Sequence, residues 1–474
     1  MKRRQNGFGT RVRQIGTGLA GVVLVSALAA ACSSSSSTTA SSGSTAAAGS
    51  GGGAGTTSTC GTAVGVGPKN PSGVYSSLSP ELRKIYTSYP DNLIASPWAT
   101  TKITAKPPWK IGYIAFAITN PYNQHVLDGL KQQFAEAKAA GLVTGSLVTN
   151  IPATMAASTA EQQISAIQQM VRQGVNAIIV LPFDSVAETP AINAAGKAGV
   201  PVILADTPPA PGNNYAVSAW TQNQVQADAG ALGLIQKGNI IIVKGIAGNQ
   251  NDVVLYNQKI ANLKNCPDIH VAATLYGNWD EGTAKTVVSQ YIASHPQPLA
   301  GVLQDGGMMA GIVQAFEANG QKVPVIADGQ CGGGDLSWWL QHKDTYKTVG
   351  GCINGFQGAY TYFNVTLRVL DNKGPKVNIL SMPITPITNA NLATFAKPGL
   401  PLTSQEEVGG PETVRVSSDR RRSFAPDSRR ACACRHHRTR AFPLHCERRN
   451  GGAARAAPRV CPQGHRIADD GSAA

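Results

Sequence analysis

Two short apolar runs decide the fold expected of this chain: Gly174-Val175-Asn176-Ala177-Ile178-Ile179-Val180 and Ala198-Gly199-Val200-Pro201-Val202-Ile203. They predict strands at 176–181 and 200–205 in which apolar residues follow one another without polar residues between them. Strands of this kind are buried on both faces, which is typical of a parallel sheet covered by helices. Residues 185–198 have helical spacing, so the segment predicts a strand–helix–strand unit.

The same alternation extends in both directions from these runs. Toward the N-terminus we expect a strand at 110–118 and helices at 126–140 and 160–172. Toward the C-terminus a second series follows, with helices at 222–236, 280–294 and 308–319 and strands at 239–243, 270–275, 300–303 and 324–327. Two such series predict an α/β protein with two doubly wound parallel-sheet lobes, whose ligands bind beyond the carboxyl ends of the strands.

The segments before these series have a different composition. Residues 60–108 form an N-terminal prefix, in which Ser79-Pro80-Glu81 predicts the start of a short helix. Residues 33–59 contain almost only Ser, Thr, Gly and Ala, which is typical of a flexible linker.

Residues 1–32 have the layout of an export signal, with basic residues first and an apolar stretch at 19–31. The apolar stretch is shorter than the roughly 20 residues that a membrane-spanning helix needs. The small residues Ala29-Ala30-Ala31 stand directly before Cys32. This arrangement resembles the lipobox of bacterial lipoproteins, which implies lipidation of Cys32 and a membrane anchor outside the cytoplasm. An ordinary cleaved signal with a chance cysteine is the alternative.

The net charge of +14 does not indicate a nucleic-acid partner. Residues 1–32 carry +5 and residues 415–474 carry +9, which leaves residues 33–414 without net charge. A nucleic-acid-binding body would carry a clustered basic face. Residues 414–474 are rich in Arg, Ala, Cys and His, a composition that predicts a basic tail of low order. The tail resembles a frameshift product of a high-GC gene, and a genuine surface-binding tail is the alternative.

Four cysteines fall within the expected folded body: Cys60, Cys266, Cys331 and Cys352. Disulfides persist in exported proteins, and four cysteines allow three pairings. Cys331 and Cys352 are close in sequence and lie beside Gly-rich turns. We therefore favour a disulfide between these two, with free thiols as the alternative.

Two motifs match cofactor or metal patterns by their letters alone. Gly16-Thr17-Gly18-Leu19-Ala20-Gly21 fits the dinucleotide-binding pattern, but it lies inside the signal segment and lacks the required flanking strand and helix. Cys432-Ala433-Cys434 and the neighbouring histidines do not have the spacing of a standard zinc site. The sequence also contains no nucleophile-elbow motif and no phosphate-binding loop motif. We expect no cofactor, no metal and no enzymatic activity.

Polar and aromatic residues follow the predicted strands directly. The strand-end segments are Thr119-Asn120-Pro121-Tyr122-Asn123, Pro182-Phe183-Asp184, Asp206-Thr207, Asn249-Gln250-Asn251, Asn278-Trp279, Gln304-Asp305 and Asp328-Gly329. Carboxylates accept hydrogen bonds from sugar hydroxyls, and aromatic rings cover the apolar faces of a sugar ring. Residues of these types could contact a molecule that carries hydroxyl groups.

Residues 110–385 resemble the type 1 periplasmic-binding-protein family in these segments and in the two apolar runs. This is the ribose- and galactose-binding group of ABC-importer substrate-binding proteins. The resemblance implies two lobes joined by a three-strand hinge near residues 219–222, 352–354 and 383–385. Lobe 1 then comprises residues 109–219 plus 353–383, and lobe 2 comprises residues 220–352 plus 384–413.

The resemblance also implies roles for single residues. Asp206 and Asp328 match hydroxyl-binding positions, Tyr122 and Trp279 match stacking positions, and Asn120 matches an amide after the first strand. The strand-end segments complete the expected ligand-binding set with Asn123, Phe183, Asn251 and Asp305. The alternatives are turn or helix-cap roles for the aspartates and core packing for the aromatic residues.

The chain departs from the family at positions where arginine is common. Thr207 and the run Asn251-Asp252-Val253-Val254 stand there instead. Gly306 stands where an asparagine is common, and Cys352 lies near a frequent glutamine. The loss of these cations and amides argues against a simple pentose or hexose and favours a larger or less polar ligand.

The expected function is that of an extracytoplasmic solute-binding lipoprotein of an ABC importer. It would capture a sugar-like molecule between its lobes and deliver it to a membrane permease, and its lipid anchor would hold it at the membrane. A ligand-sensing lipoprotein that acts on a membrane signalling receptor is the alternative. A sugar-responsive repressor shares the fold, but Cys32 and the linker occupy the place of its DNA-binding helices.

Overall fold

The computed structural model describes residues 60–406 except 66, 87, 88, 90, 222, 223, 330 and 383. All of these residues fall within one structural unit, Ser58–Ala474. Cys32, the linker at 33–59 and the tail at 414–474 lie outside the described residues, so the predictions for them stay predictions. None of the described helices combines the length and the apolar character that a membrane crossing requires.

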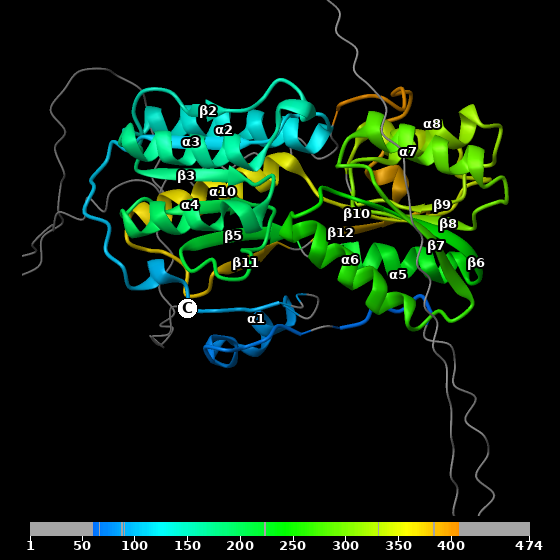
Figure 1. The fold of residues 1–474 in the computed structure, drawn as a ribbon, viewed down its shortest axis with the longest axis horizontal. Coiled ribbons are helices and arrows are strands. Elements are labelled where there is room, and N and C mark those ends of the chain that lie inside the picture. The colour runs from blue at the N-terminus through cyan, green and yellow to red at the C-terminus, as the bar shows by residue number, and fades with distance from the viewer. Residues whose placement is uncertain are drawn as a thin grey trace, which may run out of the picture. The chain divides into compact units, whose positions relative to one another are not determined.

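The first described sheet, that of lobe 1, has six parallel strands in the order β11-β5-β4-β3-β1-β2 (Figure 1). Its strands are β1 (Ile111–Ala115), β2 (Val148–Asn150), β3 (Ala177–Leu181), β4 (Val202–Ala205), β5 (Ala216–Thr221) and β11 (Ile379–Met382). Its helices are α2 (Pro121–Ala139), α3 (Ala160–Arg172), α4 (Ser185–Lys197) and α10 (Gly355–Leu370). Ile178 and Val180 pack against α3 and α4, whereas Ile179 and Leu181 belong to the core beneath α2 and α10. Both faces of the sheet are therefore covered, as the continuous apolar strands predict.

The second described sheet, that of lobe 2, has four parallel strands in the order β7-β6-β8-β9. They are β6 (Gly238–Lys244), β7 (Ile269–Tyr276), β8 (Gly301–Gln304) and β9 (Val325–Ala327). Helices α5 (Gln224–Ile235) and α6 (Gln250–Leu263) cover the face that carries Ile240 and Ile242. Helices α7 (Glu281–Ser294) and α8 (Met309–Ala318) cover the opposite face, which carries Ile241 and Val243.

Within the described residues, the chain passes between the two lobes three times. It crosses between Thr221 and Gln224, between Cys352 and Gly355, and between Met382 and Thr385. A two-stranded antiparallel sheet of β10 (Val349–Cys352) and β12 (Thr385–Thr388) adjoins the last two crossings. Helix α9 (Gly333–Gln341) precedes β10. The predicted α/β fold with two parallel-sheet lobes is confirmed.

The prefix packs against both lobes. Its predicted short helix is α1 (Pro80–Lys84), and the Ser79 hydroxyl caps it by accepting a hydrogen bond from the Leu82 amide. The indole of Trp98 donates to the Tyr215 carbonyl of lobe 1 at 2.7 Å. A disulfide joins Cys60 to Cys266 of lobe 2, with the two Cα atoms 4.8 Å apart. The prefix is therefore tied to lobe 1 by packing and to lobe 2 by a covalent bond.

A second disulfide joins Cys331 to Cys352, with their Cα atoms 4.7 Å apart. This is the pairing that the sequence favours. It links the segment before α9 to the end of β10, beside one of the crossings between the lobes.

Candidate ligand-binding site

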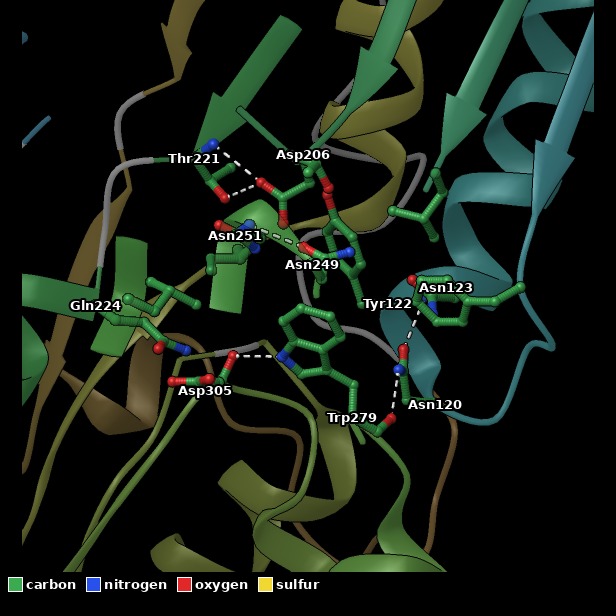
Figure 2. A pocket seen from close by; sticks show the side chains of 15 residues that line it. Asn120, Tyr122, Asn123, Asp206, Thr221, Gln224, Asn249, Asn251, Trp279 and Asp305 are labelled. Atoms are coloured by element: carbon green, nitrogen blue, oxygen red, sulfur yellow. Dashed lines mark hydrogen bonds between the residues drawn. The ribbon is translucent and has the colours of Figure 1, made fainter. Parts of the chain in front are cut away.

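A cavity lies between the lobes at the carboxyl ends of their strands (Figure 2). Lobe 1 and the crossings contribute Phe116, Asn120, Tyr122, Asn123, Leu181, Asp206, Thr207, Thr221 and Ile353. Lobe 2 contributes Gln224, Asn249, Asn251, Leu255, Trp279 and Asp305. The cavity volume is about 40 Å³, which holds a few water molecules but no monosaccharide.

Seven of the nine predicted ligand-binding residues line this cavity: Asn120, Tyr122, Asn123, Asp206, Asn251, Trp279 and Asp305. The structure does not bring Phe183 and Asp328 to it. The Phe183 side chain packs against the hydrophobic core. The backbone of Asp328 is bonded to β10, where its carbonyl accepts from the Gly351 amide at 2.8 Å, and its side chain is buried.

Two aromatic rings of the lining are stacked. Phe116 and Trp279 have their ring centroids 6.3 Å apart and their planes 13° from parallel. The indole nitrogen of Trp279 donates to the Asp305 carbonyl at 3.0 Å, which fixes the ring (Figure 2). Tyr122 also lines the cavity, and its hydroxyl is bonded to the Tyr362 hydroxyl at 2.6 Å. Its stacking role stays a prediction.

Asp206 directly follows β4 and has a left-handed backbone, with φ at +45°. Its carboxylate accepts hydrogen bonds from the amide and hydroxyl of Thr221. Burial raises the pKa of Asp206 to about 7, although hydrogen bonds from Thr221 and Tyr122 oppose the rise. Asn278 and Trp279 also have left-handed backbones, with φ at +58° and +52°. Such conformations are unfavourable in residues other than glycine and gather at functional sites.

Hydrogen bonds join the two lobes around the cavity. The side-chain amide of Asn120 donates to the Trp279 carbonyl at 2.9 Å (Figure 2). The side-chain amide of Asn249 donates to the Pro182 carbonyl at 2.7 Å. The lobes are therefore in contact, and the residues of both lobes enclose the cavity.

Several residues of the site carry no signal in the sequence. Phe116 falls within the strand predicted at 110–118, whereas β1 ends at Ala115. Gln224 begins a helix predicted from residue 222, and no motif distinguishes it from the polar residues around it. Thr221 ends β5, a strand that the sequence pattern does not predict. Leu255 lies in the second turn of α6 and Ile353 in a loop, so neither follows a predicted strand.

The cavity offers hydrogen-bonding groups and ring faces rather than a metal centre. Among the described residues, no group of three or more His, Cys, Asp or Glu side chains is placed to hold a metal ion. The charged residues that line the cavity are Asp206 and Asp305. Two carboxylates, several amides and two facing rings can bind an uncharged molecule that carries hydroxyl groups.

The chain matches the family model described as periplasmic binding protein domain over residues 111–347, which is half of its 474 residues. It is 31% identical to the xylitol-binding protein of Mycolicibacterium smegmatis over 172 residues, or 35% of this chain and 48% of that protein. The alignment thus spans about half the length of that relative.

Two solved ABC transporter solute-binding proteins have similar structures. The protein from Bacillus halodurans, with bound myo-inositol, has a TM-score of 0.53 and 17% identity, and the match covers 62% of this chain and 99% of that one. The protein from Mycobacterium smegmatis, with bound glycerol, has a TM-score of 0.53 and 20% identity, covering 63% and 99%. These similarities show a shared fold. From the family match over residues 111–347 and the two parallel-sheet lobes, the chain belongs to the periplasmic binding protein family.

Proposed function

We propose that this protein captures an uncharged polyhydroxy solute between its lobes and delivers it to the permease of an ABC importer. In this proposal it acts outside the cytoplasm as a lipoprotein anchored through Cys32. The solute is a sugar or a sugar-like polyol. No covalent chemistry is required, because capture and release need only hydrogen bonds, ring contacts and lobe movement.

One observation carries the proposal: carboxylates, amides and two nearly parallel rings from both lobes line the same cavity. Carboxylates bind hydroxyl groups through strong, charge-assisted hydrogen bonds. Flat rings pack against the C–H faces of a polyol or sugar. Asp206 and Asp305 are the charged residues of the described lining, so the site disfavours anions such as sugar phosphates.

The spacing of the rings indicates that the lobes open to admit a ligand. A carbon skeleton between two rings requires about 7–8 Å, because each carbon–carbon contact takes roughly 3.5–4.0 Å. The Phe116 and Trp279 centroids are only 6.3 Å apart. On opening, the two rings would move apart, and around a ligand they would return part of the way. The ligand would then stabilise the closed state, provided that it binds this state better than the open one.

The 31% identity to a xylitol-binding protein supports a polyol as the first candidate. The test is isothermal titration calorimetry of the full-length chain with xylitol, myo-inositol and D-ribose, and with D-ribose 5-phosphate as an anionic control. We expect a single site for at least one uncharged compound and no binding of the phosphate.

A pair of variants locates the binding. Asp206→Asn is expected to weaken the affinity by about ten- to a hundredfold, since one charge-assisted hydrogen bond is lost. Asp268→Asn, at an exposed position before β7, is the matched control and should bind as the wild type does. Failure of the wild type to bind any of the uncharged compounds, or equal loss in both variants, would refute the proposal.

A further inference from the structure

A lysine without exposed surface lies behind the lobe 2 wall of the cavity. The side chain of Lys259, on α6, is 0% exposed, and its ammonium group contacts three partners. It donates to Asp305 Oδ1 at 2.8 Å and to Gln224 Oε1 at 3.2 Å, and it lies 3.3 Å from Asp228 Oδ2. Asp305 and Gln224 line the cavity, whereas Lys259 itself does not.

The charge of Lys259 is retained at neutral pH. Burial alone would lower the pKa of Lys259, but the carboxylates of Asp228 and Asp305 more than offset this effect and raise it. Removing an ammonium group from water costs several kcal/mol, and an apolar residue of similar volume often gives equal or greater stability. A buried ammonium beside a cavity is therefore better explained by what it does to the cavity than by stability.

Lys259 fixes the orientation of the Gln224 amide. An ammonium group can only donate hydrogen bonds, so the Gln224 atom that faces it must be the oxygen. The NH₂ group of Gln224 is then the part left to meet a ligand. Gly329 packs closely against this NH₂ group: a Cβ at Gly329 would lie 1.9 Å from Gln224 Nε2.

The same ammonium fixes the carboxylate of Asp305. Lys259 binds its Oδ1 atom, and the Gly245 amide donates to its Oδ2 atom at 2.9 Å. These two donors hold the Asp305 carboxylate in one orientation. Since Asp305 and Gln224 contact one ammonium group, a carboxylate and an amide stand next to each other on the lobe 2 side of the cavity (Figure 2). The Asp305 side chain is 0% exposed here, so a ligand reaches it only when the lobes move apart.

We propose that Lys259 is a positioning residue that sets the specificity of lobe 2 for a vicinal diol. One hydroxyl of the diol donates to Asp305, and the adjacent hydroxyl accepts from the Gln224 amide. This inference rests on the proposed function, because it takes the solute to be polyhydroxy. It adds that Lys259, which lies outside the cavity, orients the donor of Gln224 and the acceptor of Asp305.

Removal of the Lys259 charge would leave two buried acids without the cation between them. Asp228 faces Lys259 from α5 and Asp305 faces it from the end of β8. The ion pair of Asp252 on α6 and Lys244 on β6, 2.9 Å apart, adjoins Asp305. Without Lys259, Asp305 Oδ1 and Gln224 Oε1 lose the donor that they share. The carboxylate and the amide would then no longer be held in orientations that present an acceptor beside a donor.

The test compares full-length Lys259→Met with Lys264→Met, an exposed lysine just after α6, by calorimetric titration of xylitol. We expect Lys259→Met to weaken binding by about ten- to a hundredfold and Lys264→Met to bind as the wild type does. Lys259→Arg, which keeps a cation that can only donate hydrogen bonds, should retain more of the wild-type affinity than Lys259→Met does.

A purely structural role makes a different prediction: Lys259→Met would have a lower melting temperature and wild-type affinity, and this result would overturn the inference. If Lys259→Met does not fold, the charge-balanced double variant Lys259→Met/Asp228→Leu takes its place, with the same expected loss and wild-type affinity again as the contrary result. If wild-type protein binds none of xylitol, myo-inositol and D-ribose, the proposed function and this inference fail together. Wild-type binding with unchanged Lys259→Met affinity removes only the inference.

Discussion

Asp206 shows how one residue combines fold and function. It occupies the first position after β4, where the backbone must turn away from the sheet, and it adopts φ at +45°. The turn directs its carboxylate to Thr221, at the last residue of the neighbouring strand β5. The strand-end pattern predicts the position of Asp206, because parallel strands end at one edge of a sheet.

The raised pKa of Asp206 predicts a pH-dependent affinity. Burial raises it to about 7, so the free protein carries a proton there below that pH. Hydroxyl binding to the carboxylate requires loss of this proton. The affinity for xylitol should therefore fall by about tenfold per pH unit below pH 7 and be constant between pH 7.5 and 9. Titrations in buffers of different ionisation enthalpy should detect proton release on binding.

Asp206→Asn is the control for this pH dependence. The variant has no titrating group at the position, so its weaker affinity should be independent of pH between 5.5 and 7. A wild-type affinity that does not change over this range would contradict the assignment of the carboxylate as the hydroxyl acceptor.

Gly245 predicts a steric effect on the stacking ring. A Cβ at this position would lie 2.3 Å from the Trp279 indole, so Gly245→Ala must displace the ring. We expect a loss of xylitol binding of at least about tenfold and a lower melting temperature. Gly282→Ala is the matched control, because its Cβ would meet only a carboxylate oxygen at 3.4 Å within α7. The control should bind normally and be stabilised by about 0.5–1 kcal/mol.

Some residues of the site could be predicted and others could not, for a physical reason. Asn120, Asp206 and Asp305 follow strands and carry groups that bind hydroxyls, so position and chemistry agree. Phe116 is apolar and follows an apolar strand, so the sequence does not distinguish it from a core residue. Lys259 determines which atom of the Gln224 side-chain amide faces it. This contact depends on tertiary packing, so no local sequence pattern predicts it.

At the scale of elements, α6 shows why a helix can be hidden in sequence. Its buried face carries the polar residues Gln258, Lys259 and Asn262 as well as apolar ones. An amphipathic pattern requires an apolar buried face, so this helix was not predicted. The same polar residues form the network behind the cavity. The helix that the amphipathic pattern does not predict therefore carries Lys259, the residue proposed to set specificity.

Glu188 predicts the pH dependence of the α4 N-terminus. This buried carboxyl accepts hydrogen bonds from the amides of Phe183 and Asp184 at 3.0 and 2.8 Å, and burial raises its pKa to about 8. The folded state thus binds its proton more tightly than the unfolded state does. The contribution of Glu188 to stability should fall between pH 4.5 and 8, by at most about 1.4 kcal/mol per unit, and then remain constant.

Denaturant unfolding of Glu188→Gln and Glu161→Gln across pH 4.5–9 checks this prediction. The amide of Glu188→Gln does not titrate, so the stability of this variant relative to the wild type should rise up to pH 8. Glu161 is exposed in the first turn of α3, and its variant should follow the wild type at every pH. Parallel curves for the wild type and Glu188→Gln would show that Glu188 is not the titrating group.

At the scale of the whole molecule, the two lobes could be predicted because their strands are apolar on both faces. The attachment of the prefix could not, because it depends on contacts between distant residues such as Trp98 and Tyr215. The disulfide between Cys60 and Cys266 spans 206 residues, whereas that between Cys331 and Cys352 spans 21. The closed loop is thus about ten times longer in the first case.

Loop length predicts unequal effects of the two disulfides on the free energy of unfolding. Loop-closure entropy makes the longer cross-link more stabilising by about 2 kcal/mol. Cys60→Ser/Cys266→Ser should therefore lower the free energy of unfolding by more than Cys331→Ser/Cys352→Ser does, as measured by denaturant titration under non-reducing conditions. Equal or reversed losses would show that local packing outweighs the loop term.

Binding of a polyhydroxy solute between the lobes can be observed in a crystal structure of the full-length chain grown with xylitol. We expect xylitol between Phe116 and Trp279, with hydroxyls on Asp206 and Asp305 and the ring centroids moved apart from 6.3 Å to about 7–8 Å. Xylitol bound away from this cavity, or an unliganded cavity in protein shown by calorimetry to be saturated with xylitol, would contradict it.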